Sequence, residues 1–302
     1  MKRREIPHTS IAVSEICLGT MTFGSPVDRP SSVRLIHEAL ARGINFIDTA
    51  NMYEGYARTA GSPGGVAEEI VGEALKGRRS EVIVATKLGM KVGPEPEDEY
   101  TSPAAIRKQL DLSLKRLQTD YIDIYYLHRP DPYTKPEDIV QELDRAIRAG
   151  KIRHYAVSNY NREQLEALLK AAEACGAPKP VMCQPPLSLL KQEVYRELAP
   201  LCREENIAVV PYQILQGGLL TGKYRRSAPA PKGSRLQEKP DWMWKLDDEL
   251  FAKLEAVEAG AARRGLTMTQ YAIRWVLEQP QVVSAIIGVK NVEQIETATS
   301  AC

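Results

Sequence analysis

The feature that most constrains this chain of 302 residues is a regular alternation of short β-branched runs with longer segments of helical spacing. In segments such as "SPAAIRKQLDLSLKRL", apolar residues recur every three or four positions, which is typical of an amphipathic helix. Strands that alternate with helices in this way predict a parallel sheet covered by helices. The expected strands are Glu15–Leu18, Asn45–Asp48, Val82–Thr86, Ile122–Leu127, Tyr155–Ser158, Val181–Gln184, Ala208–Pro211 and Val283–Ile287.

Two architectures fit such a pattern, a closed (β/α)8 TIM barrel and an open doubly wound sheet. The number and even spacing of the strands favour the barrel, and no Gly-x-Gly-x-x-Gly loop follows an early strand, as an open dinucleotide-binding sheet would normally show. The interval before the last strand contains "RRSAPAPKGSRLQEKPDWMW" and then two helices. We interpret it as a long loop over the barrel mouth. We therefore expect one barrel domain spanning residues 1–302.

Composition limits the possible partners and compartments. A formal net charge of +1 argues against a nucleic-acid-binding protein, although it allows one local anion site. Polar residues interrupt the basic N-terminus, so we expect no signal peptide, and no apolar stretch is long enough to cross a membrane. The five cysteines are scattered and lack metal-ligand spacing, which predicts a reducing, cytoplasmic environment without disulfides or a bound metal.

Four polar residues follow the ends of three neighbouring expected strands. Asp48 ends the second strand and Tyr53 follows it, Lys87 ends "VIVATK", and His128 follows "DIYYL". In a parallel barrel, strand ends and their loops gather on one rim, where active sites occur. Taken singly, each residue has an ordinary structural interpretation as a turn cap, a packed phenol, a rim charge or a core histidine. Together they predict a catalytic site.

The types of these side chains indicate which chemistry the site performs. A phenol has a pKa near 10 and donates a proton poorly until a nearby cation stabilises its phenolate. Lys87 can supply that cation, Asp48 can orient the ammonium, and His128 can hydrogen-bond a carbonyl oxygen. Reduction of that carbonyl also needs a hydride, which side chains do not carry, so a nicotinamide cofactor is implied.

These motifs resemble those of a known family. "INFIDTANMY", "ATKLG" and "YLHRPD" closely resemble the tetrad motifs of the aldo-keto reductases, and the similarity extends from "SEICLGTMTFG" through "GKIRHYAVSNY" to "SAIIGVKNVEQIE". The chain looks most like the bacterial branch that also resembles the potassium-channel β-subunits. The resemblance implies an NADPH-dependent reductase of a small carbonyl substrate, with Tyr53 as general acid, Lys87 and Asp48 tuning it, and His128 orienting the carbonyl.

The resemblance also implies contacts to NADP(H) bound in extended form. It assigns Ser158, Asn159 and Gln184 to the nicotinamide carboxamide, Tyr212 to the nicotinamide ring, Leu215, Gly217, Gly218 and Lys223 to the pyrophosphate, and Gly288, Lys290 and Gln294 to the adenosine 2′-phosphate and adenine.

Physical arguments agree with these assignments. Glycines 217 and 218 allow the backbone to approach a phosphate, and a helix that starts near Asn291 would direct its positive end at the 2′-phosphate. We expect NADPH rather than NADH because Lys290 has basic residues near it, namely Lys223 and Arg235.

The sequence departs from the family pattern in three places. Residues 213–216 read Gln-Ile-Leu-Gln in the pyrophosphate loop, Thr297 and Ala298 stand where adenine contacts are usual, and the segment from Glu54 to Gly65 is longer than usual. Two alternative functions remain: an NADP(H)-binding regulatory subunit like the channel β-subunits, and a barrel enzyme that uses Lys87 as a Schiff base. We expect specificity to come from Phe23, Tyr56, the Arg129–Tyr133 loop, Trp242 and Trp244.

Overall fold

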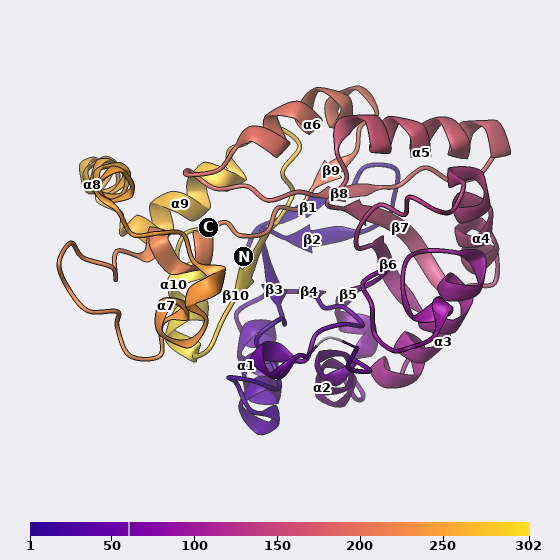
Figure 1. Ribbon diagram of the computed structural model, residues 1–302, viewed down its shortest axis with the longest axis horizontal. Helices are drawn as coiled ribbons and strands as arrows, with labels where there is room; N and C mark the ends of the chain where they lie inside the picture. The colour runs from indigo at the N-terminus through magenta and orange to yellow at the C-terminus, as the bar shows by residue number, and fades with distance from the viewer. Residues whose placement is uncertain (60) are drawn as a thin grey trace.

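A computed structural model describes residues 1–59 and 61–302 of the chain (Figure 1). Eight parallel strands form one sheet of order β10-β3-β4-β5-β6-β7-β8-β9, and β1 and β2 form a separate antiparallel pair. The strands are β1 (Arg3–Glu5), β2 (Ala12–Ser14), β3 (Ile16–Gly19), β4 (Phe46–Asp48), β5 (Ile83–Leu88), β6 (Ile122–Leu127), β7 (Ile152–Ser158), β8 (Met182–Gln184), β9 (Ala208–Val209) and β10 (Ala285–Gly288).

The two edges of the parallel sheet meet and close it into a barrel. The amide of Val283 donates to the carbonyl of Val209 over 3.0 Å, and the amide of Ile286 donates to the carbonyl of Pro211 over 3.0 Å. These bonds join the β9 edge to the β10 edge, so the fold is the (β/α)8 barrel that the alternating pattern predicts. In Figure 1 the strands occupy the middle of the molecule and the helices surround them.

The helices cover the outside of the barrel, and their ends follow local capping rules. Asn161 and Gln164 form a capping box at the start of α5, and Gly176 ends that helix in the left-handed conformation. Asp28 caps the first helix by accepting a hydrogen bond from the amide of Ser31. The longer helices are α1 (Arg29–Ala41), α2 (Val66–Ala74), α3 (Pro103–Leu117), α4 (Pro136–Arg148), α5 (Arg162–Cys175), α6 (Glu193–Glu204), α8 (Asp248–Arg263), α9 (Met268–Leu277) and α10 (Val292–Thr299).

Apolar side chains form separate layers inside and outside the barrel wall. Phe46, Ile124 and Tyr126 are fully buried in the cluster that fills the barrel, whereas Ile47 and Tyr125 belong to the layer between the barrel and its helices. Successive residues of a strand point to opposite faces, so both layers are built from the same short runs. The site described below rests on this packed interior.

The N-terminal hairpin is a feature that the sequence interpretation missed. Strands β1 and β2 pair over three residues, and Ile6, Ile11 and Val13 are buried in the same cluster as the barrel interior. The hairpin therefore extends the core that fills the barrel. Such short strands show too little alternation to stand out from a polar N-terminus.

The boundaries of the predicted strands also shift. β7 starts at Ile152, ahead of the polar pair Arg153 and His154 that hid its beginning, and β9 ends at Val209, before Pro211. β10 starts at Ala285.

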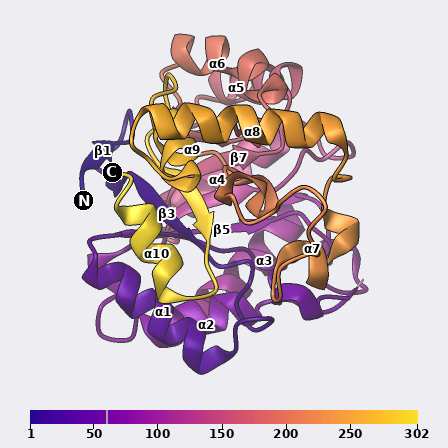
Figure 2. The same ribbon diagram turned by 90° about the vertical axis from the view of Figure 1, so that its left-hand side faces the viewer.

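The long segment between β9 and β10 packs against the barrel through its own apolar cluster. Its elements are η4 (Gln216–Thr221), α7 (Arg235–Glu238), η5 (Pro240–Trp242), α8 and α9. Leu219, Leu220 and Tyr224 are buried with Leu250 and Phe251 of α8. Figure 2 shows α8 lying across this side of the molecule, with α7 below its right-hand end. The segment is thus held in place, as expected for a functional loop on a rigid scaffold. Three further single-turn helices are η1 (Gly55–Ala57), η2 (Arg79–Glu81) and η3 (Pro96–Asp98).

Candidate active site

A fully buried lysine lies at the centre of the site. Lys87 Nζ is 2.5 Å from Asp48 Oδ1, donates to the carbonyl of Thr49 over 2.7 Å, and lies 3.4 Å from Tyr53 Oη. Asp48 is the last residue of β4, and Lys87 is near the end of the neighbouring strand β5. Parallel strands that end on one rim therefore bring together the acid, the ammonium and the phenol, as the sequence predicts.

The surroundings of Lys87 keep it protonated. Burial alone would lower the pKa of this ammonium, but the charge of Asp48 and the hydrogen bonds to Asp48 and Tyr53 raise it above its ordinary value. A buried charge is tolerable only when it is paired and hydrogen-bonded, and Lys87 satisfies both conditions. The site thus holds a permanent positive charge beside the phenol.

Tyr53 and His128 share the space above this ammonium. Burial raises the pKa of Tyr53, Lys87 opposes that rise and Asp48 adds to it, so the phenol stays protonated at neutral pH. The rings of Tyr53 and His128 meet edge to face with centroids 5.9 Å apart. Burial, aided by Lys87 and Arg129, holds the pKa of His128 well below its usual range. The imidazole is therefore neutral and can hydrogen-bond an oxygen without adding charge.

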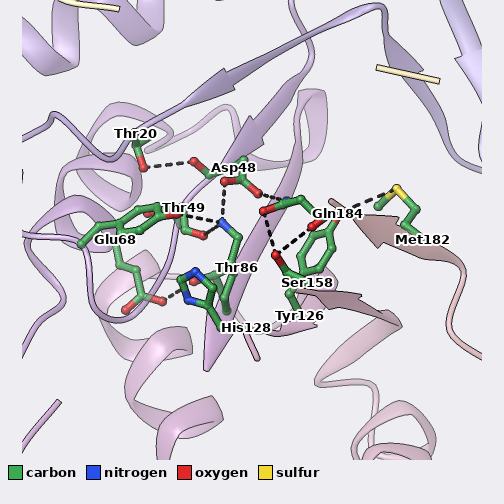
Figure 3. Close-up of polar contacts among 12 residues, drawn as sticks. Thr20, Asp48, Thr49, Glu68, Thr86, Tyr126, His128, Ser158, Met182 and Gln184 are labelled. Atoms are coloured by element: carbon green, nitrogen blue, oxygen red, sulfur yellow. Dashed lines mark hydrogen bonds and ion pairs between the residues drawn. The ribbon is translucent and has the colours of Figure 1, made fainter. Parts of the chain in front are cut away.

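A chain of hydrogen bonds joins four further predicted residues to this centre. Gln184 Nε2 donates to Asp48 Oδ2 over 2.9 Å, and Ser158 Oγ donates to the Gln184 carbonyl over 3.0 Å (Figure 3). Asn159 Nδ2 donates to the His128 carbonyl over 2.8 Å, and Tyr212 Oη donates to Asn159 Oδ1 over 2.6 Å. Asn159 holds a positive φ of 61°, a conformation that asparagine tolerates better than most residues. These side chains therefore line one connected polar edge of the barrel mouth.

The glycine-rich turn after β9 has backbone in the left-handed region, which glycine adopts most readily. Gly217 and Gly218 have φ of 65° and 94°, and a Cβ on Gly218 would stand 2.6 Å from Lys223 Nζ. The Lys223 ammonium thus lies directly over bare backbone. Leu215 precedes this turn and is partly buried against two apolar clusters. Such a turn beside a cation is suited to binding a phosphate.

Three cations gather at the mouth beside this turn. Lys290 lies between β10 and α10, Arg235 is the first residue of α7, and Lys223 follows η4. Burial lowers the pKa of Lys223, and the charges of Lys290 and Arg235 lower it further. Within the described part of the chain, Glu238 is the carboxylate that pairs with one of the three, Lys290. The cluster therefore carries excess positive charge in a half-buried place, which favours a bound anion.

The predicted adenosine end lies next to this cluster. Helix α10 begins at Val292 with Asn291 as its cap, as expected, and the amide of Lys290 donates to Gln294 Oε1 over 2.8 Å. Gly288 at the end of β10 is exposed, and a Cβ added there would touch nothing. The exposed backbone beside a helix N-terminus leaves room for a ligand.

The long segment from Glu54 to Gly65 reaches this cluster. Its described residues are held by Glu54, which pairs with Arg58 and accepts from the amide of Gly64 over 3.1 Å. Arg235 Nε lies 3.3 Å from Tyr56 Oη, and Lys290 Nζ stands 5.2 Å from the Tyr56 ring centroid. Tyr56 thus contacts both Arg235 and Lys290, which lie far from it in sequence. We had expected Tyr56 in the substrate pocket only.

Several other expectations concern the walls of the pocket. Phe23 is fully buried in the outer core, so it presents no exposed surface to a ligand in this structure. Trp242 packs edge to face on Tyr56 at 5.5 Å, and Trp244 and Tyr133 are exposed. The sequence did not predict that Glu238 would pair with Lys290 or that the Thr49 carbonyl would accept a hydrogen bond from Lys87.

Two negative observations apply to residues 1–59 and 61–302. No three His, Cys, Asp or Glu side chains in these ranges lie close enough together to hold a metal ion. No helix in the same ranges has the length and apolar character needed to span a membrane.

Comparisons with known proteins agree with this geometry. The family model described as "Aldo/keto reductase family" matches residues 15–302. "Aldo-keto reductase YhdN" of Bacillus subtilis is 33% identical over 98% of this chain and 87% of its own length. A "Probable voltage-gated potassium channel subunit beta" of Arabidopsis thaliana is 29% identical over 98% of this chain and 89% of its own.

A solved structure shows the same architecture. The glycerol dehydrogenase AKR11B4 from Gluconobacter oxydans superimposes with a TM-score of 0.82 at 31% identity, covering 99% of this chain and 89% of that one. With the family match over residues 15–302, these similarities lead to one conclusion: the chain belongs to the aldo/keto reductase family of oxidoreductases.

Proposed function

We propose that this chain reduces an aldehyde or ketone to an alcohol with NADPH, using Tyr53 as the proton donor. The observation that carries the proposal is the fully buried Lys87 ammonium, which contacts both Asp48 and Tyr53 Oη. A cation beside a phenol stabilises the phenolate that forms when the proton leaves. The cofactor, when bound, supplies a hydride to the carbonyl carbon.

Each residue of the tetrad then has a role in moving or placing the proton. Tyr53 gives its hydroxyl proton to the carbonyl oxygen, and Lys87 stabilises the oxygen that remains negatively charged. Asp48 touches no substrate and holds Lys87 in place, with Gln184 donating to its second oxygen. The neutral imidazole of His128 orients the carbonyl by a hydrogen bond.

The cation cluster supports NADP(H) as the cofactor. Lys223, Arg235 and Lys290 have one carboxylate partner among the described residues, which leaves positive charge to meet phosphate groups. Lys223 over Gly218 suits the pyrophosphate, and Lys290 beside α10 suits the adenosine 2′-phosphate. Ser158, Asn159 and Gln184 would meet the nicotinamide end.

The test separates chemistry from binding. Tyr53→Phe should lower kcat with a carbonyl panel by roughly two to four orders of magnitude, while its NADPH affinity by fluorescence titration stays near parental. Tyr125→Phe is the matched control, because the Tyr125 hydroxyl is buried and has no hydrogen-bond partner in the described part of the chain. Parental turnover in Tyr53→Phe would show that another group donates the proton.

One specific similarity favours a second candidate, an NADP(H)-binding regulatory subunit. The Arabidopsis relative is named as a probable channel subunit. This candidate predicts tight NADPH binding with no turnover on any aldehyde or ketone of the panel. Schiff-base chemistry at Lys87 is disfavoured, because an attacking amine must be neutral and accessible, whereas Lys87 is fully buried and held protonated.

A further inference from the structure

Lys290, the lysine that would bind a 2′-phosphate, already forms an ion pair with the carboxylate of Glu238. Lys290 Nζ pairs with a carboxylate oxygen of Glu238 and also donates to the carbonyl of Gly233 over 2.9 Å. Glu238 is the last residue of α7, so it belongs to the long segment between β9 and β10 and not to the loop that carries Lys290. The Lys290 and Glu238 side chains are 25% and 27% exposed, so the pair is only partly screened by water.

The other cations of the cluster have no such partner within the described residues. Arg235 lies against the hydroxyl of Tyr56, and Lys223 lies over Gly218. Glu238 forms its ion pair with the cation beside the helix that would receive the adenosine phosphate, and its charge also acts on Lys223 without pairing with it. A phosphate dianion and a carboxylate cannot both occupy the same face of that ammonium.

We infer that Glu238 is a specificity-determining residue that competes with the cofactor's 2′-phosphate for Lys290. The inference rests on the proposed use of a nicotinamide cofactor. NADPH must displace the carboxylate to reach Lys290, whereas NADH lacks the 2′-phosphate and can bind with the pair intact. The Lys290–Glu238 pair therefore weakens the binding of NADPH but not that of NADH. As a result, Glu238 reduces the ratio by which the protein prefers NADPH over NADH.

The experiment measures binding, not turnover. Fluorescence titrations determine Kd for NADPH and NADH, and calorimetry determines Kd for 2′,5′-ADP and 5′-ADP, in the parent, in Glu238→Gln and in Asp241→Asn. Asp241 is an exposed acid three residues further along the same segment, so its variant removes one negative charge without breaking the Lys290 pair. Glu238→Gln should tighten NADPH and 2′,5′-ADP by about three- to tenfold, the range expected for loss of a partly exposed ion pair. NADH and 5′-ADP should change by less than about twofold in every variant.

A second variant links the effect to Lys290. In a Lys290→Gln background, Glu238→Gln should no longer change the ratio of NADH Kd to NADPH Kd, because the contested cation is gone. Persistence of the effect in that background would overturn the inference, since the gain would then come from general charge.

The remaining outcomes distinguish this inference from the proposed function. If the parent prefers NADPH and Glu238→Gln leaves the preference unchanged or reduces it, the inference fails and the cofactor assignment stands. If neither the parent nor Glu238→Gln distinguishes 2′,5′-ADP from 5′-ADP, both fail, because the 2′-phosphate is then not bound at this cluster. A 2′-phosphate preference that appears only in Glu238→Gln supports the inference and corrects the assignment for the parent.

Discussion

Removing the Asp48 carboxylate should destabilise the protein in a way that depends on pH. In Asp48→Asn the shape is kept, but the fully buried Lys87 ammonium loses its counter-ion. Breaking a buried ion pair by removing one partner typically costs about 3–5 kcal/mol of unfolding free energy. The buried ammonium has an alternative, which is to lose its proton.

Deprotonation of Lys87 sets an upper limit on the unfolding free energy that Asp48→Asn can lose. A lysine with an ordinary pKa of about 10.4 costs about 1.4 kcal/mol to deprotonate for each unit that the pH lies below that value. The loss of stability is therefore limited to about 5 kcal/mol at pH 7 and to about 2 kcal/mol at pH 9. In the variant, the unfolded state binds one more proton than the folded state over this range, so its stability rises with pH.

The parent should not show this slope from Lys87. Its folded pKa is raised by Asp48, so both the folded and the unfolded states hold the proton between pH 7 and 9. The stability that the raised pKa contributes is fully present in this range and is lost only as the pH rises through the folded pKa.

Urea unfolding at pH 7, 8 and 9, followed by circular dichroism, measures the difference between parent and variant. The difference should shrink by about 1.4 kcal/mol per pH unit. In Asp48→Asn/Lys87→Met no ammonium remains, so the pH-dependent part should disappear. Parallel stability curves for the parent and Asp48→Asn across this range would refute the claim that Lys87 is a paired, buried cation.

Two further predictions concern the imidazole and the long segment after Tyr53. Burial lowers the pKa of His128, so its imidazole should remain neutral as the pH falls from 7.5 to 5.5. Its NMR signal, assigned by comparison with His128→Asn, should therefore not move over this range. Because the unfolded state binds the proton first, His128 should also make the free energy of unfolding fall below about pH 6.5. Gly55→Ala should destabilise the protein by more than about 2 kcal/mol in thermal unfolding, because φ is 63° and the new Cβ would stand 1.8 Å from the Ser25 carbonyl oxygen. Gly61 has a φ of 80° but open space around it, so Gly61→Ala should cost about 1 kcal/mol in the same measurement. Equal costs at the two glycines would show that the Ser25 contact does not hold this segment.

The meeting of the four tetrad residues on one rim could be predicted, because their placement follows from local pattern. Asp48 and Lys87 end apolar runs, and parallel strands must end on one rim. The barrel itself followed from the strand count and the missing glycine fingerprint. The hairpin of β1 and β2 could not be foreseen, because three-residue strands carry almost no periodic signal and gain their stability from packing beneath the barrel.

The contacts at the cluster of Lys223, Arg235 and Lys290 could not be predicted in the same way. Glu238 and Lys290 are 52 residues apart, and Tyr56 and Arg235 are 179 residues apart, in segments without a repeating apolar pattern. No spacing rule relates such positions, since the path of each loop decides whether the side chains meet. Arg235 and Lys290 could be named as basic residues from the sequence, but the carboxylate that opposes them could not.

The two groups of residues differ in predictability because one stands at strand ends and the other stands on loops. The groups that we propose to move the proton stand at strand ends over a packed barrel interior, where Lys87 and Asp48 are buried. The groups that we propose to meet the phosphates stand on loops joined by single contacts such as Lys290 with Glu238 and Arg235 with Tyr56. Loop contacts of this kind can change one at a time at a cost of about 1 kcal/mol each. Cofactor preference should therefore respond to substitution at residue 238 while the Lys87–Tyr53 geometry and its chemistry stay as they are.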